Sequence, residues 1–198
     1  MTTPIPPIIP SRTALLLMDF QPAVLAAVPH SAHALSRAQA GLAWARSHDV
    51  RVVYVRVAFA PEDFAAVPRR NKTFAAVAQH GFLADGSPDT DLHDCLDVRD
   101  DDIVVRKTRI GALSDATGLH ESLQAQGIDT LVLAGLSTSG VVLTTLRHAA
   151  DEDYRLYVLK DATADPDPEV HRLLIEKVFP QQAEIIDTDD LWTLGKAV

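Results

Sequence analysis

The sequence contains almost no cysteine: Cys95 is the only one among 198 residues. A single thiol excludes an intrachain disulfide and any metal site built from several cysteines. Cys95 lies in the polar stretch DLHDCLDVRDDD, where no helix N-terminus or cationic partner is evident beside it. Because those features are the ones that lower a thiol pKa, we interpret Cys95 as incidental rather than catalytic.

Long apolar runs and an excess of positive charge are also missing. No stretch approaches the length of a membrane span, and no charged-then-apolar signal pattern opens the chain. Lys and Arg total 18 against 27 Asp and Glu, which gives a net charge of −9. This balance disfavours nucleic acid and anionic membrane surfaces as partners. We therefore expect a cytoplasmic protein that binds neither nucleic acid nor membrane.

The histidines show no metal-ligand pattern. They are scattered along the chain, at His30, His33, His48, His80, His93, His120, His148 and His171. A zinc site needs three or four ligands brought together by regular spacing, and none is evident here. We expect no metal and no cofactor, and we expect His148 to lie on a helix surface.

What the sequence does contain is a regular alternation of apolar runs and helical patterns. A hydrophobic content of 47% in 198 residues is enough for one sizeable core. Several runs are continuously apolar, as strands covered on both faces should be. The predicted strands are Ala14–Met18, Val50–Val57, Ile103–Val105, Thr130–Ala134, Leu156–Leu159 and Glu184–Ile186. The pattern predicts an α/β fold, a three-layer sandwich with a six-stranded parallel sheet and helices on both faces.

The predicted helices have recognisable ends. Asp115 is a plausible N-cap and Gly127 a plausible C′ residue for one of them, and Asp167 followed by Pro168 begins another. Four prolines in MTTPIPPIIPSR make residues 1–12 an extended arm, which we expect to pack on a neighbouring subunit. Residues 13–198 then form one domain.

Three features come together at one edge of this predicted sheet. Asp19 closes the run TALLLMD, Lys107 closes IVVRK, and a turn at Gly135–Gly140 follows the run TLVLA. Ligands of open α/β sheets bind beyond the carboxyl ends of the strands, and all three features lie at such ends. A strand that leads into a helix N-terminus also builds a site for developing negative charge. The spacing therefore predicts a pocket at this edge.

The motifs TALLLMD, IVVRK, TLVLAGLSTSGVVLTT and DATAD resemble those of the isochorismatase-like hydrolase superfamily, also called the cysteine hydrolases. The resemblance extends from about Thr13 to the C-terminus. It implies an Asp–Lys–Cys triad, whose members would be Asp19, Lys107 and position 141. Here position 141 is Val141, which can neither attack a substrate nor accept a proton. The resemblance thus implies the fold and a small-molecule substrate or ligand, and leaves the reaction open.

The resemblance also implies roles for single residues. The family's aspartate takes a proton from the thiol in amidase-type members and donates one to an enol carbon in isochorismatase-type members. The lysine would stabilise the charged form of Asp19 and any nearby oxyanion. Zinc-dependent nicotinamidases of the superfamily carry an aspartate and two histidines after the second strand, where this chain has VRVAFAPEDF.

The glycine-rich turn is expected to bind substrate or an oxyanion through Leu136, Ser137, Thr138 and Gly140. The family carries a cis peptide at the position of Leu136–Ser137, so we expect one here. Thr138 or Ser139 would cap the following helix. A hydroxyl does not replace the missing thiol readily, because Ser139, two positions before Val141, points elsewhere on a helix.

Two further residues are expected at the rim of the pocket, Gln21 and Arg109. Arg109 would bind an acidic substrate group, although a surface salt bridge is an alternative for it. The segment from Ala58 to Asp102 is irregular and would cover or border the pocket.

Two functions remain open at this stage. The first is an isochorismatase-like hydrolase that acts without a cysteine, with Asp19 as acid or base and Lys107 as electrostatic partner. The second is a catalytically inactive protein of the same fold that binds a small molecule. Cysteine-type amidase chemistry is disfavoured by Val141. The resemblance and the proline-rich arm favour a homo-oligomer.

Overall fold

The computed structural model describes residues 4–195 and has a single all-parallel sheet at its centre. The strands are β1 (Thr13–Met18), β2 (Arg51–Val57), β3 (Ile103–Lys107), β4 (Thr130–Leu136), β5 (Arg155–Ala164) and β6 (Glu184–Ile186). Their order across the sheet is β3-β2-β1-β4-β5-β6. The predicted α/β fold with a six-stranded parallel sheet is confirmed.

The strand order reverses between β1 and β4. From β1 the chain builds outward through β2 to β3, and then returns to pair β4 with the other side of β1. The connections on the two sides of this point run over opposite faces, and sheets of this kind bind ligands at the carboxyl ends of the strands beside such a point. Topology alone therefore makes this edge the place to search for a site.

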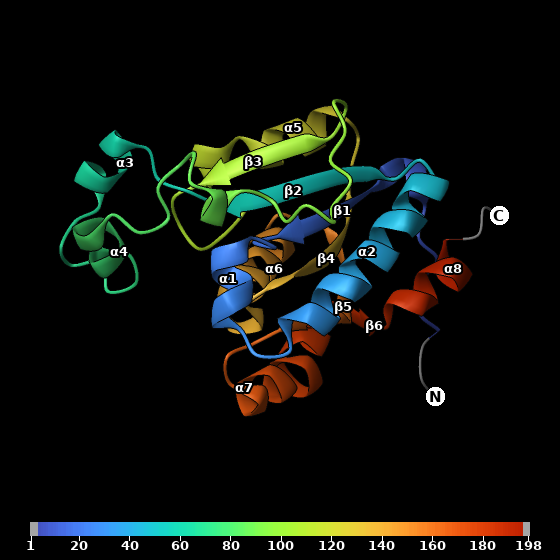
Figure 1. Cartoon of the computed structure of the whole chain (residues 1–198). Coiled ribbons are helices and arrows are strands. Elements are labelled where there is room, and N and C mark those ends of the chain that lie inside the picture. Colours follow the sequence, from blue (N-terminus) through green and yellow to red (C-terminus); the bar gives the residue numbers. More distant parts are fainter. Residues whose placement is uncertain (1–3, 196–198) are drawn as a thin grey trace.

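Helices cover both faces of the sheet (Figure 1). Their bounds are α1 (Pro22–Ala27), α2 (Ser31–Ser47), α3 (Pro61–Ala66), α4 (Ala75–His80), α5 (Leu119–Ala125), α6 (Leu143–Asp151), α7 (Pro168–Leu173) and α8 (Leu191–Leu194). Helices α2 and α8 pack on one face, and α5 and α6 on the other. Helices α3 and α4 project away from the sheet (Figure 1). No helix within residues 4–195 is long and apolar enough to cross a membrane.

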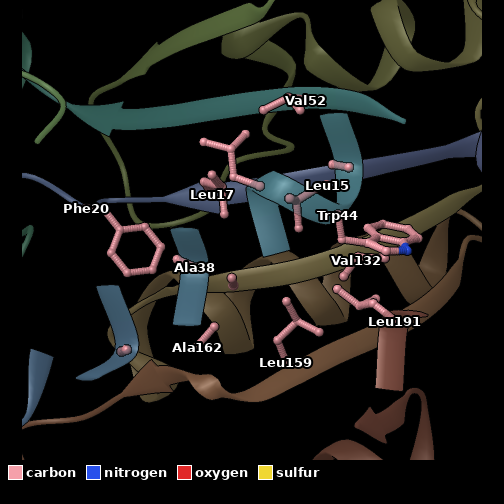
Figure 2. Close-up of a cluster of buried hydrophobic side chains, with 14 of the residues drawn as sticks. Leu15, Leu17, Phe20, Ala38, Trp44, Val52, Val132, Leu159, Ala162 and Leu191 are labelled. Atoms are coloured by element: carbon pink, nitrogen blue, oxygen red, sulfur yellow. The ribbon is translucent and has the colours of Figure 1, made fainter. Parts of the chain in front are cut away.

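Strand β1 is apolar from Ala14 to Met18 because the protein covers it on both faces. All of its residues are buried, and successive side chains point to opposite faces. Leu15 and Leu17 join the cluster under α2, together with Ala38 and Leu159 (Figure 2). Leu16 belongs to the second cluster, on the α5 and α6 side. A strand covered on both faces is therefore almost entirely apolar, and the one polar side chain of β1, Thr13, donates its hydroxyl to the carbonyl of Ile9 at 2.7 Å.

The N-terminal segment contacts its own chain. The Tyr157 hydroxyl donates to the carbonyl of Pro6 at 2.9 Å, and the Ile8 amide donates to the carbonyl of Leu194 at 2.9 Å. Residues 4–9 therefore lie against α8 and against the edge of the sheet where the strands begin. Contact of the expected arm with a neighbouring subunit stays a prediction. Residues 1–3 of the expected arm lie outside the described residues.

Two helix ends differ in how well the sequence anticipated them. Asp167 caps α7 as expected, because its carboxylate accepts the amides of Glu169 and Val170. Asp115 was expected to cap α5 but instead begins a 3-10 turn, and Gly118 precedes α5 with a φ of 62°. A left-handed residue is easiest for glycine, so the chain turns there and the helix starts later.

Candidate functional site

Asp19 and Lys107 meet at the carboxyl ends of β1 and β3. Lys107 Nζ donates to Asp19 Oδ2 at 2.8 Å and to the carbonyl of Arg109 at 3.2 Å. Asp19 is 5% exposed and Lys107 4% exposed, so the pair is shielded from water. Asp19 Oδ1 is buried and has no hydrogen-bond partner among the described residues. Half of the carboxylate is thus satisfied and half is left open.

The backbone at Asp19 makes this contact possible. In regular alternation Asp19 would continue the face of Leu17, which packs under α2. Lys107 continues the face of Val105, on the α5 and α6 side. Asp19 instead has a φ of 60°, in the left-handed region, and its amide donates to the carbonyl of Val55 at 2.8 Å. This turn brings the carboxylate to the lysine of the opposite face.

Burial decides the protonation of Asp19. Removal from water raises the pKa of the Asp19 carboxyl above its ordinary value of 3.8, and the charge and hydrogen bond of Lys107 oppose this effect without overcoming it. The open Oδ1 atom agrees with that direction, because a buried carboxylate oxygen without a donor is unfavourable when ionised. Asp19 is therefore a group that can hold a proton.

The β4–α6 turn (residues 137–142) completes this edge of the sheet. The peptide bond between Leu136 and Ser137 is cis, and Thr138–Val142 form a π-helical turn before α6. A Cβ on Gly135 would lie 2.7 Å from the carbonyl oxygen of Met18, so only glycine lets β4 approach the end of β1. Val141 is 2% exposed and belongs to the apolar cluster on the α6 side.

The cap of this turn differs from the prediction that Thr138 or Ser139 would supply it. Asp165, at the end of β5, accepts the amide of Ser139 at 2.7 Å. The Thr138 hydroxyl instead lies 2.8 Å from Nδ1 of His171 on α7. A carboxylate is a stronger acceptor than a hydroxyl for an exposed helix amide, and the fold delivers it from a distant strand. Neither Asp165 nor His171 was selected from the sequence.

The hydroxyls of Ser137 and Thr144, which lie near Val141 in the sequence, contact the backbone of the turn. Ser137 Oγ packs so closely over Gly140 that a Cβ there would lie 2.8 Å from it. Thr144 donates its hydroxyl proton to the carbonyl of Gly140 at 2.8 Å. No described residue supplies either hydroxyl with a side-chain base in hydrogen-bond contact, which an attacking hydroxyl requires.

Gln21 and Arg109, both expected at a pocket rim, lie in different environments. Gln21 is fully buried, and its amide group donates to the carbonyls of Val57 and Thr90 and accepts the Val57 amide. It therefore joins β1 to β2 and to the irregular segment rather than bordering a pocket. Arg109 is partly exposed, and its guanidinium donates to the carbonyl of Thr108 at 2.6 Å.

Cys95 has a neighbour that the sequence did not reveal. Its Sγ lies 3.1 Å from Nδ1 of His93. Burial nevertheless raises the pKa of the Cys95 thiol, and the nearby Asp94 charge raises it further. The residue remains a thiol at neutral pH and lies on the α2 side, with its carbonyl bound by Gln39. Its separation from β4 and α6 keeps it out of the site.

Surface cavities of about 220 to about 820 Å³ on the described part of the chain are lined by residues other than Asp19, Lys107 and Val141. The low exposure of Asp19 and Lys107 shows that the pair is enclosed in this conformation. The loop after Lys107 helps to enclose it, because the amide of Ala112 donates to the Thr145 hydroxyl of α6 at 3.1 Å. Within residues 4–195, no group of three or more His, Cys, Asp or Glu is arranged to hold a metal ion.

Comparisons with known proteins agree with this arrangement of strands and strand ends. The isochorismatase domain profile matches residues 13–190. The chain belongs to the isochorismatase family. It is 29% identical to the isochorismatase family protein YecD of Escherichia coli O157:H7, over 90% of this chain and 94% of that protein. It is 27% identical to maleamate amidohydrolase of Pseudomonas putida, over 90% of this chain and 84% of the enzyme.

A solved structure extends the likeness to three dimensions. The cysteine hydrolase from Pseudomonas syringae pv. phaseolicola 1448A superposes with a TM-score of 0.85, at 26% identity and over 96% of both chains. This agreement extends over nearly the whole chain, so the likeness is one of the complete fold.

Proposed function

We propose that this protein is a small-molecule hydrolase of the isochorismatase type that acts without a cysteine nucleophile. Asp19 is its acid and base, Lys107 is the electrostatic partner of Asp19, and Val141 occupies the place of the nucleophile. The observation that carries the proposal is the unpartnered, buried Oδ1 of Asp19, together with its raised pKa. A carboxyl group whose pKa is raised by burial keeps its proton to a higher pH than an exposed one, which suits it to general-acid catalysis.

The reaction that fits these groups is hydrolysis of a vinyl ether. Asp19 donates its proton to the terminal carbon of the C=C–O group, and the adjacent carbon becomes an oxocarbenium ion. Water adds to that carbon and returns a proton to the Asp19 carboxylate. The hemiketal then collapses to a ketone and an alcohol, so that the sum is the addition of one water. No step requires a thiol, which agrees with valine at position 141.

Lys107 and the β4–α6 turn have separate tasks in this scheme. The Lys107 ammonium stabilises the Asp19 carboxylate after proton donation, at the 2.8 Å contact between them. Leu136, Ser137, Thr138 and Gly140 shape the wall that faces the substrate. Arg109, partly exposed beside the pair, binds an acidic group of the substrate. The likeness to maleamate amidohydrolase, whose name denotes an acidic amide substrate, is consistent with a small acidic ligand here.

A second candidate function is small-molecule binding without turnover. It is favoured by the burial of Val141 in the apolar cluster and by the closure of the site in this conformation. A pocket that binds without reacting needs no nucleophile and tolerates a closed resting state. The buried Asp–Lys pair favours the hydrolase. Burying charged groups costs free energy of folding, and a pocket that only binds a ligand does not require such a pair.

One experiment separates the two. Purified wild-type protein and Asp19→Asn are incubated with isochorismate-type vinyl ethers and with small acidic amides, and turnover and thermal shift are measured together. Turnover by the wild type that disappears in Asp19→Asn supports the hydrolase. A thermal shift in both proteins with no turnover supports the binding protein. Mass spectrometry of any co-purified ligand then identifies the compound class.

The proposal includes a cytoplasmic homo-oligomer with one domain over residues 13–198 and no metal or cofactor. Light scattering at micromolar concentration tests the oligomer, and a clean monomer would reject it. Turnover that persists after exhaustive chelation tests the metal-free chemistry.

A further inference from the structure

The β4–α6 turn is tied to α7 by a side-chain contact that the proposed chemistry does not use. Thr138 follows the cis bond directly and is fully buried, and its Oγ1 lies 2.8 Å from Nδ1 of His171. The two residues are 33 positions apart in the chain. Helix α7 starts beyond the end of β5, so this contact joins two strand ends across the sheet edge (Figure 1).

A second link runs beside the first. One carboxylate oxygen of Asp165 accepts the Ser139 amide at 2.7 Å, and the other accepts the Asp167 amide at 3.2 Å. The Asp165 link therefore connects the turn to the start of α7 through backbone groups. The Thr138–His171 link differs in kind, because an imidazole changes its hydrogen-bonding capacity when it takes up a proton.

His171 is only partly buried and also borders a cavity. This cavity, of about 220 Å³, lies between α2 and the end of β5. The titratable groups that share this cavity are His30, His33, Lys160, Asp161 and Asp165. Burial lowers the pKa of His171 below its ordinary value of 6.5, and the charge of Asp165 opposes that shift. The imidazole is therefore neutral at pH 7.

The charges nearest to the cavity are already paired with other groups. Asp161 binds Arg37 at 2.7 Å, and Lys160 binds Asp187 at 2.9 Å. Asp165 is occupied by the two amides described above. His30 and His33 line the same cavity from the α1–α2 side.

We propose that His171 is a positioning residue for the β4–α6 turn. In its neutral form Nδ1 accepts the hydroxyl proton of Thr138, and this bond holds the turn in the orientation that presents position 141 to Asp19 and Lys107. Protonation of His171 makes Nδ1 a donor, so the buried Thr138 hydroxyl must accept instead and its own proton loses its acceptor, which loosens the turn. The inference rests on the proposed function in one respect, namely that the turn is a wall of the reacting site.

The test uses a reporter that needs no substrate. In Cys95→Ser/Val141→Cys protein, the rate of iodoacetamide alkylation against pH gives the pKa of the thiol at position 141. We expect His171→Leu and Thr138→Val each to raise this pKa by about one unit, a roughly tenfold loss of thiolate at a fixed pH below it. The two together should do no more than either alone, because they break the same bond.

Two further variants distinguish positioning from simple packing. His171→Asn keeps an acceptor near the place of Nδ1 but does not titrate, so it should restore the low thiol pKa and remove any step in the profile near the His171 pKa. His148→Leu, on the partly exposed surface of α6, is the matched control and should leave the profile unchanged. An unchanged thiol pKa in His171→Leu would overturn the inference while the site itself stands.

Another outcome would count against the proposed site and not against the role of His171. If the thiol at position 141 has an ordinary pKa even with His171 present, the proposed placement of the site is wrong. Amide hydrogen exchange then decides the inference by itself. His171→Leu should speed exchange at residues 138–142 relative to His148→Leu, and the wild type should show the same loss of protection as the pH falls through the His171 pKa. Equal protection in all three proteins would overturn the inference.

Discussion

Asp19 and Lys107 form a buried pair in which only one carboxylate oxygen is satisfied. Oδ2 accepts from Lys107 Nζ at 2.8 Å, and Oδ1 is buried without a partner among the described residues. An ion pair built only for stability would leave no such oxygen, because an unsatisfied buried acceptor costs about 1–3 kcal/mol. The open oxygen therefore points to a group that exchanges protons or contacts a ligand.

The first prediction concerns the pH dependence of turnover. Because burial raises the pKa of Asp19 and the acid form is the proton donor, we expect kcat/KM to be constant below that pKa and to fall about tenfold per pH unit above it. The measurement is a pH–rate profile of the wild type on whichever vinyl ether it hydrolyses. A rate that climbs with pH over the same range would assign Asp19 the role of a base instead.

The second prediction concerns the charge balance of the pair. Lys107→Met leaves the Asp19 carboxylate buried without its cation, so the free energy of unfolding at pH 7 should drop by about 3–5 kcal/mol. Asp19→Asn/Lys107→Met removes both charges and should recover most of that loss. Urea unfolding of both variants measures the difference. Equal losses in the single and double variants would show that the charges are not coupled.

The same variant has a predicted pH signature. Without Lys107, the folded-state pKa of Asp19 lies further above its unfolded value of 3.8. A folded pKa above the unfolded one means that the folded protein binds more protons in between, so stability falls as pH rises through that window. Lys107→Met should therefore approach wild-type stability below about pH 4, where Asp19 is protonated in both states.

The third prediction concerns position 141. Val141→Cys in a Cys95→Ser background should produce a thiol with a pKa below the free value of about 8.5, because Lys107 and the start of a helix both favour thiolate. The rate of alkylation by iodoacetamide, measured from about pH 5 to about pH 10, gives the pKa of this thiol. The Cys95 thiol of the wild-type protein, measured separately, is the comparison, since burial raises its pKa and should make its alkylation slow. If the introduced thiol is alkylated as slowly as Cys95, position 141 belongs to the hydrophobic core and not to the proposed site.

The fourth prediction separates scaffold from pocket at Gln21. Gln21→Ala strands the Val57 amide and two carbonyls inside the protein, so we expect a loss of about 3 kcal/mol in the free energy of unfolding. The KM of the folded fraction should not change. Gln39→Ala is the matched control, because its exposed amide makes one bond to the Cys95 carbonyl and its loss should change stability by less than about 0.5 kcal/mol. A raised KM in Gln21→Ala with normal stability would return Gln21 to the pocket rim.

The sequence by itself determined the sheet and the edge that carries the site. Strands buried on both faces are almost entirely apolar, so the runs at β1 and β4 were visible without any contact information. Asp19 follows the β1 run, and Lys107 closes the shorter and partly exposed run IVVRK of β3. Because all strands are parallel, their carboxyl ends had to share one edge. Chain order and local chemistry were sufficient for these conclusions.

The tertiary structure alone decided which groups touch. Strand β5 continues past the polar Lys160 and Asp161, where its register with β4 shifts, and pairs with β4 again at Thr163 and Ala164; no local pattern predicts that extension. The β4–α6 turn is held by Asp165, which accepts the Ser139 amide, and by His171, which contacts the Thr138 hydroxyl; these residues lie 26 and 33 positions from their partners. The left-handed turn at Asp19 moves its carboxylate to the opposite face. Such contacts depend on how distant segments pack, and periodicity along the chain carries no record of them.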